Sequence, residues 1–407
     1  MTSGGKDMEK KNSVPRTAYA IAFTTSLGGG FYWPYVSIYA VELGASYSEI
    51  GLISAISNAS PTVLQPLWGY LSDKLMKRKI FILLGNIISG FIILFFAYTR
   101  KPLIYAILLA LSMIALSAVT PAWNSYIGSF FEKRERGRGV GRINGIGFIG
   151  TIIGALVSGL IMTILIGEKN ILQYSFAFTI AGISLIIGGL LSLNIHDPTG
   201  NNDGYSLEYI MSSIKRNNYF KRLVLAEAMW SFSMSMAWPM FSAGWIYKLH
   251  ATKFQIAIAN VAFNISFMIG QLFLGFLADV YGRKKVITTS RFVFPLYPLM
   301  WYIAWRVEII YLANLIVGLA NAVATIAIFA YILDVTQEEE RASYFAIYNM
   351  VLGISQFLGS YTGGFIGDSF KQFMGMIPAL HMVFLISSAL RLLTAIPYLF
   401  IKETLTS

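Results

Sequence analysis

Long apolar runs separated by short polar loops dominate the chain. No charged residue occurs between Arg16 and Glu42, nor between Glu49 and Asp73. Because a bilayer core needs about 20 apolar residues per helix, each of these runs predicts a membrane-spanning helix. Similar runs predict further spans at residues 80–99, 102–131, 143–167, 170–195, 223–247, 254–278, 286–305, 309–333, 342–367 and 374–401.

Two of these runs contain an arginine. Arg291 interrupts span 286–305, which makes that span the weakest prediction of the set. Arg391 lies some ten residues from the end of the last span. Its long side chain is therefore expected to reach the membrane surface by snorkelling, with a structural role.

A polar stretch divides the spans into two sets of six. Residues 197–204 are rich in Pro, Gly and Asn, which is typical of a linker. The predicted fold class is an all-α membrane protein with 12 transmembrane helices in two pseudo-symmetric six-helix bundles. The expected parts are an N-terminal tail (1–16), a first bundle (17–195), a cytoplasmic linker (196–222), a second bundle (223–401) and a C-terminal tail (402–407).

Composition supports a membrane protein. Of 407 residues, 56% are hydrophobic and 13% are charged, whereas a soluble domain carries about 25% charged residues. The formal charge of +11 resides mainly in short loops between apolar runs, which argues against a nucleic-acid partner. Cysteine is absent, so no disulfide framework exists. The apolar run after the N-terminal tail is too long for a cleavable signal peptide.

The distribution of basic residues predicts the orientation. If both termini lie on one side, that side receives 24 of the 31 Lys and Arg residues. The positive-inside rule then places both termini in the cytoplasm, in a multi-pass protein of the cell membrane.

The two halves of the chain are internal copies. Trp33-Pro34 and Trp238-Pro239 are 205 residues apart, and Asn144 and Asn349 share that spacing. Parallel repeats of six-helix halves occur in secondary transporters, which place the substrate near the midplane between the halves. Each proline is expected to interrupt its helix, and a matched pair of bends suits either a moving gate or inherited geometry.

A short motif recurs in the loops after the second and eighth spans. The first copy consists of Gly69, Leu71, Asp73, Lys74, Lys77 and Arg78. The second copy consists of Gly275, Leu277, Asp279, Gly282, Arg283 and Lys284. With these residues, the whole chain resembles a major facilitator superfamily transporter, although Met76 and Val280 depart from the family pattern.

That resemblance implies a gating role for the motif, which would hold the cytoplasmic ends of the halves together in the outward-facing state. Each carboxylate is expected to meet a helix N-terminus or a nearby arginine. The alternative is that the basic residues only fix orientation. A glycine motif of the family's antiporters is also matched in spacing, although Ala155 and Ser158 depart from it and plain helix packing explains it as well; the matching positions are Gly141, Gly150, Gly154, Ser158 and Gly159.

The resemblance also implies a central cavity, lined by the first, fourth, seventh and tenth helices with help from neighbouring ones. Amides at mid-depth and aromatic residues near the path are the expected substrate-binding groups. Interhelical hydrogen bonds and interfacial aromatic belts are the alternatives. The candidates are Tyr32, Trp33, Asn58, Gln65, Trp123, Asn124, Trp230, Trp238, Asn264, Gln271, Asn321 and Gln356.

Glu227 is the candidate for coupling to a proton or ion, because an ionisable group inside a membrane span marks an ion path by default. The alternative is that Glu227 pairs with a basic neighbour. No phosphate-binding loop and no cluster of metal ligands occurs, so neither an enzyme nor a cofactor is expected.

The expected function is transport of a small organic solute by alternating access, as drug or solute efflux or as sugar-like uptake. The expected partners are that solute and the lipid bilayer, and the protein is expected to be a monomer. The alternative is a receptor or assembly protein that retains the fold without transport, with a collapsed cavity and mutually paired amides. A lipid-modifying membrane enzyme lacks the necessary residues.

Overall fold

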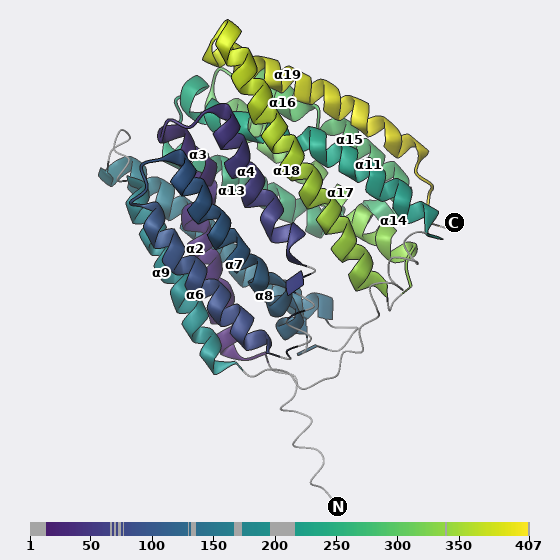
Figure 1. Cartoon of the computed structure of the whole chain (residues 1–407). Helices are drawn as coiled ribbons and strands as arrows, with labels where there is room; N and C mark the ends of the chain where they lie inside the picture. Colours follow the sequence, from purple (N-terminus) through teal and green to yellow (C-terminus); the bar gives the residue numbers. More distant parts are fainter. Residues whose placement is uncertain are drawn as a thin grey trace, which may run out of the picture. The chain divides into compact units, whose positions relative to one another are not determined.

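The computed structural model describes residues 14–65, 67–68, 71, 75, 77–128, 130–131, 136–166, 173–195, 216–337 and 340–405. The described residues form helices joined by short connections (Figure 1). Seven of the described helices are long and apolar enough to cross a membrane. The chain is therefore an all-α, multi-pass membrane protein, and the twelve expected spans remain a prediction.

Contacts divide the chain into two compact units. The first contains residues up to 34, 64–100 and 107–202, and the second contains residues 35–63, 101–106 and 203–407. The first unit holds α2 (Arg16–Tyr32), α6 (Arg78–Phe96), most of α7 (Pro102–Gly128), α8 (Arg136–Ile161), the π-helix η2 (Met162–Ile166), α9 (Gln173–Leu191) and η3 (Ser192–Asn194).

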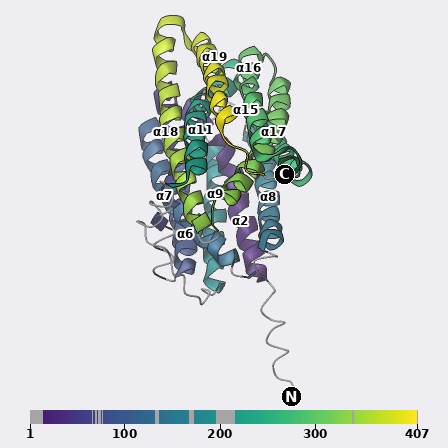
Figure 2. The same ribbon diagram turned by 90° about the vertical axis from the view of Figure 1, so that its right-hand side faces the viewer.

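The second unit begins after the first proline break, η1 (Trp33–Tyr35). Its helices are α3 (Val36–Glu42), α4 (Tyr47–Val63), α11 (Asn218–Ser235), α12 (Trp238–Ala243), the π-helix η4 (Gly244–Lys248), α13 (Lys253–Leu274), α14 (Leu277–Tyr281), α15 (Arg283–Val293), α16 (Leu296–Ile303), α17 (Val307–Asp334), α18 (Arg341–Met374), α19 (Met376–Ala395) and η6 (Ile396–Phe400). Figure 2 shows α18, α11 and α19 beside one another.

Small residues allow close packing in the first unit. A β-carbon on Gly154 of α8 would overlap the carbonyl oxygen of Leu27 in α2, and one on Gly150 would lie 2.7 Å from the carbonyl oxygen of Phe23. Helices α2 and α8 contact each other extensively as a result. Gly150 and Gly154 of the sequence motif thus serve helix packing, whereas a β-carbon on Gly141 would meet nothing within 4 Å.

Proline breaks two helices at matching places, as the sequence predicts. Helix α2 ends just before Trp33-Pro34, and α11 ends at Ser235, with α12 resuming at Trp238-Pro239. The expected span 286–305 is also broken, into α15 and α16, at Phe294-Pro295. Each break frees backbone carbonyls that a continuous helix would satisfy.

Arg391 in α19 donates to two carbonyls at these breaks, one of which, Phe294 O, also accepts from Tyr297 N at 3.1 Å. Its Nη2 donates to Met234 O at 2.7 Å, and its Nη1 donates to Phe294 O at 3.2 Å. In an unbroken helix, Phe294 O would accept from the N–H of residue 298, which is a proline. Arg391 is 1% exposed. The expected snorkelling is therefore wrong, because backbone acceptors inside the unit replace water, while the structural role is confirmed.

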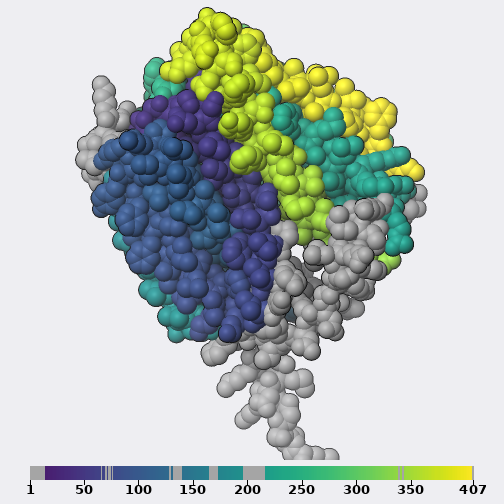
Figure 3. All heavy atoms as spheres, viewed as in Figure 1, coloured from purple at the N-terminus to yellow at the C-terminus, as the bar shows by residue number. Residues whose placement is uncertain are grey.

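Helix α4 packs along α18 within the second unit, and Figure 3 shows the two side by side at the surface. Asp368 caps the N-terminus of α4, accepting from Tyr47 N at 2.9 Å and from Ser48 N at 2.7 Å. The sequence places α4 in the first bundle, but its contacts group it with helices of the second half of the chain. The bundle limits 17–195 and 223–401 remain a prediction.

Candidate functional site

A buried ion pair joins α11 to α15. Glu227 Oε1 accepts from Arg291 Nη2 at 2.6 Å, and the two side chains are 1% and 4% exposed. The Tyr398 hydroxyl donates to Glu227 Oε1 at 2.7 Å, and the Tyr348 hydroxyl donates to Oε2 at 3.2 Å. Hydrogen bonds of this kind offset the large desolvation cost of placing a carboxylate and a guanidinium away from water.

An aromatic shell holds the guanidinium of Arg291. Its central carbon lies 3.6 Å from the ring centroid of Trp230 and 5.4 Å from that of Tyr398. Phe294 packs edge-on against Trp230, with centroids 5.1 Å apart. The cation therefore faces the electron-rich side of an indole while its charge is balanced by Glu227.

A cavity of about 520 Å³ lies beside the ion pair, inside the second unit. This volume is in the range of small-molecule sites in proteins. Helices α11, α15, α17 and α18 supply its wall. The lining residues are Glu227, Trp230, Ser231, Met234, Arg291, Asn321, Thr325, Ile328, Phe329, Phe345, Tyr348, Asn349, Leu352 and Gln356.

Three polar atoms of these lining residues are buried without a hydrogen-bond partner among the described residues. They are Arg291 Nε, Trp230 Nε1 and Ser231 Oγ. Two of them are pure donors, and the hydroxyl can donate as well. An unpaired buried donor is costly, so a small rotation of these side chains toward the cavity would let a ligand or water with acceptor oxygens pair with them.

Four of the sequence candidates meet at this cavity. Trp230 and Glu227 come from α11, Asn321 from α17 and Gln356 from α18. The pairing of Glu227 with a basic residue is also realised, but its partner is Arg291 of another helix.

Two other mid-depth amides bond within their own helices. Asn58 Nδ2 donates to Ser54 O at 2.8 Å, and Asn264 Nδ2 donates to Asn260 O at 3.0 Å. Such local bonds supply donors and acceptors that a helix at depth needs, so these amides do not require a solute. Gln271 is exposed and Gln65 is half-buried.

The remaining aromatic candidates lie away from the lining of this cavity. Tyr32 is buried and packs edge-on against Trp33, which is 42% exposed. Trp123 packs on Tyr126 in α7, next to the exposed Asn124. Trp238 is half-buried at the start of α12. As binding residues, these positions remain a prediction.

Sequence reasoning missed several residues of the site. Arg291 entered only as a flaw in a span. Asn349 entered only as the repeat partner of Asn144, and Tyr348 and Tyr398 did not enter at all. The signal for Arg291 was available: an acid in one apolar span and a base in another are each too costly to leave unpaired in the membrane. Nothing in the sequence singles out the two tyrosines among 23.

The second copy of the loop motif forms a charge network inside the second unit. Arg283 Nη1 donates to Asp279 Oδ1 at 2.6 Å, and its Nε donates to Asp334 Oδ2 at 3.2 Å. The expected meeting of the motif carboxylate with an arginine is thus confirmed for Asp279. Gly275 ends α13. In the first copy, Arg78 opens α6, whereas Gly69 and Asp73 lie outside the described residues.

The C-terminal tail completes this network. Glu403 accepts from the backbone N–H of Arg283 at 2.9 Å and of Lys284 at 3.1 Å, at the N-terminus of α15. Gly282 precedes that helix with φ +91°, and a β-carbon there would overlap the carboxylate of Glu403. Glycine is therefore favoured by the backbone angle, and a β-carbon would push the end of the flexible Glu403 side chain away from its two N–H donors.

Comparison with known proteins identifies the family to which the sequence is similar. The family model described as Major Facilitator Superfamily matches residues 18–220 and 223–407. The chain is 24% identical over 416 residues to an uncharacterized MFS-type transporter of Methanocaldococcus jannaschii, with 97% of each chain covered. It is 22% identical over 365 residues to the quinolone resistance protein NorA of Staphylococcus aureus, covering 89% of this chain and 87% of that protein.

A solved structure shares the fold. A variant of the nucleoside transporter NupG matches with a TM-score of 0.78 and 16% sequence identity, covering 94% of this chain and 98% of that chain.

Proposed function

Because the chain belongs to the major facilitator superfamily, we propose that the cavity beside Glu227 and Arg291 is the part of the transport path that binds the solute. The protein is a membrane transporter of a small organic solute, not an enzyme. The observation that carries the proposal is the 520 Å³ cavity whose wall combines a buried ion pair, unpaired donors and amides.

The wall favours a solute with acceptor oxygens and a flat ring. After a small rotation toward the cavity, Arg291 Nε, Trp230 Nε1 and Ser231 Oγ would donate to carbonyl, carboxylate or hydroxyl oxygens. Asn321 and Gln356 add groups that both donate and accept, and the stacked rings of Phe329 and Phe345, with centroids 4.8 Å apart, add an aromatic wall. Nucleosides and quinolones both have this chemistry, in keeping with the names of NupG and NorA.

The open cavity also favours transport over a receptor that has lost it. A chain without a solute would gain stability by closing the space and pairing the amides with each other. Asn321 and Gln356 instead line the cavity from two different helices.

Glu227 is the proposed coupling group. Protonation of Glu227 would remove the charge that balances Arg291, so an anionic or oxygen-rich solute would bind more strongly to the protonated site. Release of the proton would restore the ion pair and favour release of the solute. Proton binding and solute binding are then linked through one salt bridge.

The contacts of α4 with α18 are proposed to close one side of the transport path. Asp368 ties the two helices at their ends, and Lys253 forms an ion pair with Glu42 of α3. Under alternating access these contacts separate when that side opens. Both termini are proposed to face the cytoplasm, with bundles 17–195 and 223–401, and the protein is proposed to act as a monomer.

Counterflow in proteoliposomes tests the solute site. Vesicles loaded with a nucleoside, a quinolone or a sugar should accumulate the matching labelled compound when the wild-type protein is present. Gln356→Ala should raise the half-saturating concentration about tenfold, the value of one lost hydrogen bond. Gln372→Ala, an exposed position on the same helix, is the matched control. Equal effects of both variants would show that the cavity is not part of the transport path.

A pH gradient tests the coupling group separately. Concentrative transport by the wild-type protein should depend on the gradient, whereas Glu227→Gln should retain exchange and lose the gradient-driven part. Gradient-driven accumulation in Glu227→Gln would exclude Glu227 as the coupling group and leave the solute site untouched.

A further inference from the structure

A second hollow lies on the second unit, separate from the cavity of the ion pair. It is a groove of about 390 Å³, lined by Leu274, Leu277, Tyr281, Lys285, Val286, Thr289, Ser290, Val293, Leu319, Ala320 and Val323. Helix α17 contacts both α13 and α15, and its residues form one wall of the groove. Val286, Ser290 and Val293 recur at helical spacing, so one face of α15 forms another wall.

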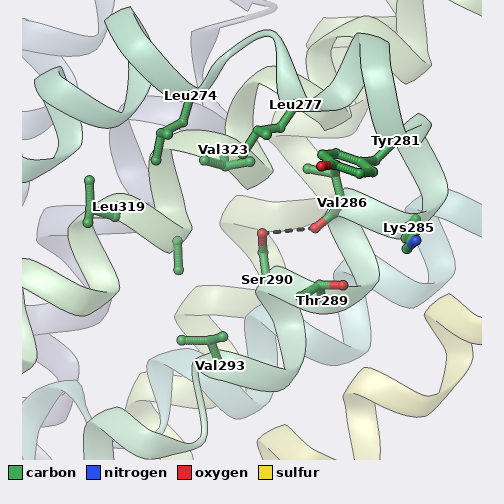
Figure 4. Close-up of a pocket in the computed structure, with 11 residues that line it drawn as sticks. Leu274, Leu277, Tyr281, Lys285, Val286, Thr289, Ser290, Val293, Leu319 and Val323 are labelled. Atoms are coloured by element: carbon green, nitrogen blue, oxygen red, sulfur yellow. Dashed lines mark hydrogen bonds between the residues drawn. The ribbon is translucent and has the colours of Figure 1, made fainter.

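The groove has a polar end and an apolar length. Tyr281 and Lys285 stand together at one end, and Val293 lies at the other (Figure 4). The Lys285 ammonium lies 5.5 Å from the ring centroid of Tyr281, and both side chains are exposed. Ser290 Oγ donates to Val286 O at 2.9 Å, so this hydroxyl is satisfied within its helix and the wall remains effectively apolar.

Over residues 272–280, the exposed side chains next to the groove-lining residues are apolar apart from Asp279, whose carboxylate is paired with Arg283. Leu272, Phe273, Phe276 and Val280 are each at least 56% exposed. Side chains of this kind at the end of a membrane-spanning helix face lipid. A groove in such a surface is therefore open to acyl chains, and its basic end attracts the phosphate of a lipid headgroup.

We propose that this groove binds an anionic phospholipid, with one acyl chain along α15 and the phosphate at Lys285 and Tyr281. The length from Val286 to Val293 is about 10 Å at a helical rise of 1.5 Å per residue, enough to hold part of one chain. Lys285 supplies the charge, and the Tyr281 hydroxyl can donate to a phosphate oxygen. The selectivity arises at the headgroup, because neutral lipids share the same acyl chains.

Helix α15 separates this lipid site from the solute cavity. Ser290 lines the groove, while the adjacent Arg291 lines the cavity. The proposal concerns binding alone and does not rest on the identity of the solute.

Native mass spectrometry of the delipidated full chain, titrated with phosphatidylglycerol or phosphatidylcholine, tests the site. The wild-type protein should bind the first phosphatidylglycerol at least fivefold more tightly than phosphatidylcholine. Lys285→Gln should weaken the binding of phosphatidylglycerol about fivefold, which is the contribution of one basic residue at a membrane surface. Lys402→Gln is the matched control, because Lys402 also lies over a tyrosine ring, that of Tyr219, at 5.3 Å.

Filling the groove provides a second test. Ala320→Trp should weaken both lipids, since it occupies the acyl-chain space, and Ala320→Leu replaces it where Ala320→Trp does not fold. Equal losses from Lys285→Gln and Lys402→Gln, or unchanged lipid binding by the filled variant, would overturn the proposal. A change of oligomeric state in Ala320→Trp with lipid affinity unaltered would assign the groove to a second copy of the chain and overturn it as well.

Discussion

The ion pair between Glu227 and Arg291 makes the sharpest energetic prediction. Glu227→Leu leaves a guanidinium buried without its counter-charge, and Arg291→Met leaves a buried carboxylate. Removing one partner of a buried pair costs about 3–5 kcal/mol. The double variant removes both charges and leaves the Tyr348 and Tyr398 hydroxyls without their acceptor, at about 1 kcal/mol each.

The two single losses therefore should not add. Their sum is about 6–10 kcal/mol, whereas the double variant should lose roughly 2 kcal/mol, which gives a coupling energy of at least about 4 kcal/mol. Thermal unfolding in detergent, monitored by size-exclusion chromatography, ranks the stability of the wild type, the two single variants and the double variant. The double variant should be more stable than either single variant. Additive losses would refute the view that the two charges compensate each other in a dry environment.

Three further variants test individual contacts. Gly282→Ala should destabilise more than Gly375→Ala in a thermal-shift assay, because both have φ above +80° but only the first meets the C-terminal tail; equal shifts would contradict this. Asp368→Ala should cost about 1 kcal/mol through the lost helix cap, while Ser369→Ala, bonded only within its own helix, should change little. Gly154→Val should abolish stable expression, since its side chain would enter α2; wild-type yield would disprove close packing there.

Much of the fold follows from hydrophobic pattern and proline chemistry. The long apolar run at 309–333 is helix α17 at nearly the same limits, and the run at 374–401 is α19 followed by η6. Pro34 and Pro239 break their helices because proline offers no N–H and crowds the preceding turn. The break at Phe294-Pro295 follows from the same proline chemistry, although the hydrophobic pattern alone predicts one span interrupted only by Arg291.

The site could be predicted only in part. Trp230, Asn321 and Gln356 stand out because polar or amphipathic side chains are rare at mid-depth. Their selection from twelve candidates depends on which face of each helix points inward, and the sequence does not determine this where helices are broken. Asn264 fits the same pattern as Asn321, yet it bonds within its own helix.

The two buried arginines show why charge is hard to interpret from sequence. Arg291 and Arg391 both lie inside apolar spans, but one meets a carboxylate and the other meets backbone carbonyls. Whether an arginine meets a carboxylate or a backbone carbonyl depends on other helices, which lie more than 60 residues away in the chain. Residue type and depth indicate that a partner must exist, and only the packing identifies it.

The bonds of Arg391 also constrain how the sequence can vary. At Phe294 O, which accepts from Tyr297 N at 3.1 Å, the guanidinium adds the second donor that Pro298 does not offer. If Pro298 became alanine, the helix would recover its own donor there, and Arg391 would still be needed at Met234 O. Position 298 should therefore vary more freely over evolutionary time than the arginine that joins two breaks in the second unit.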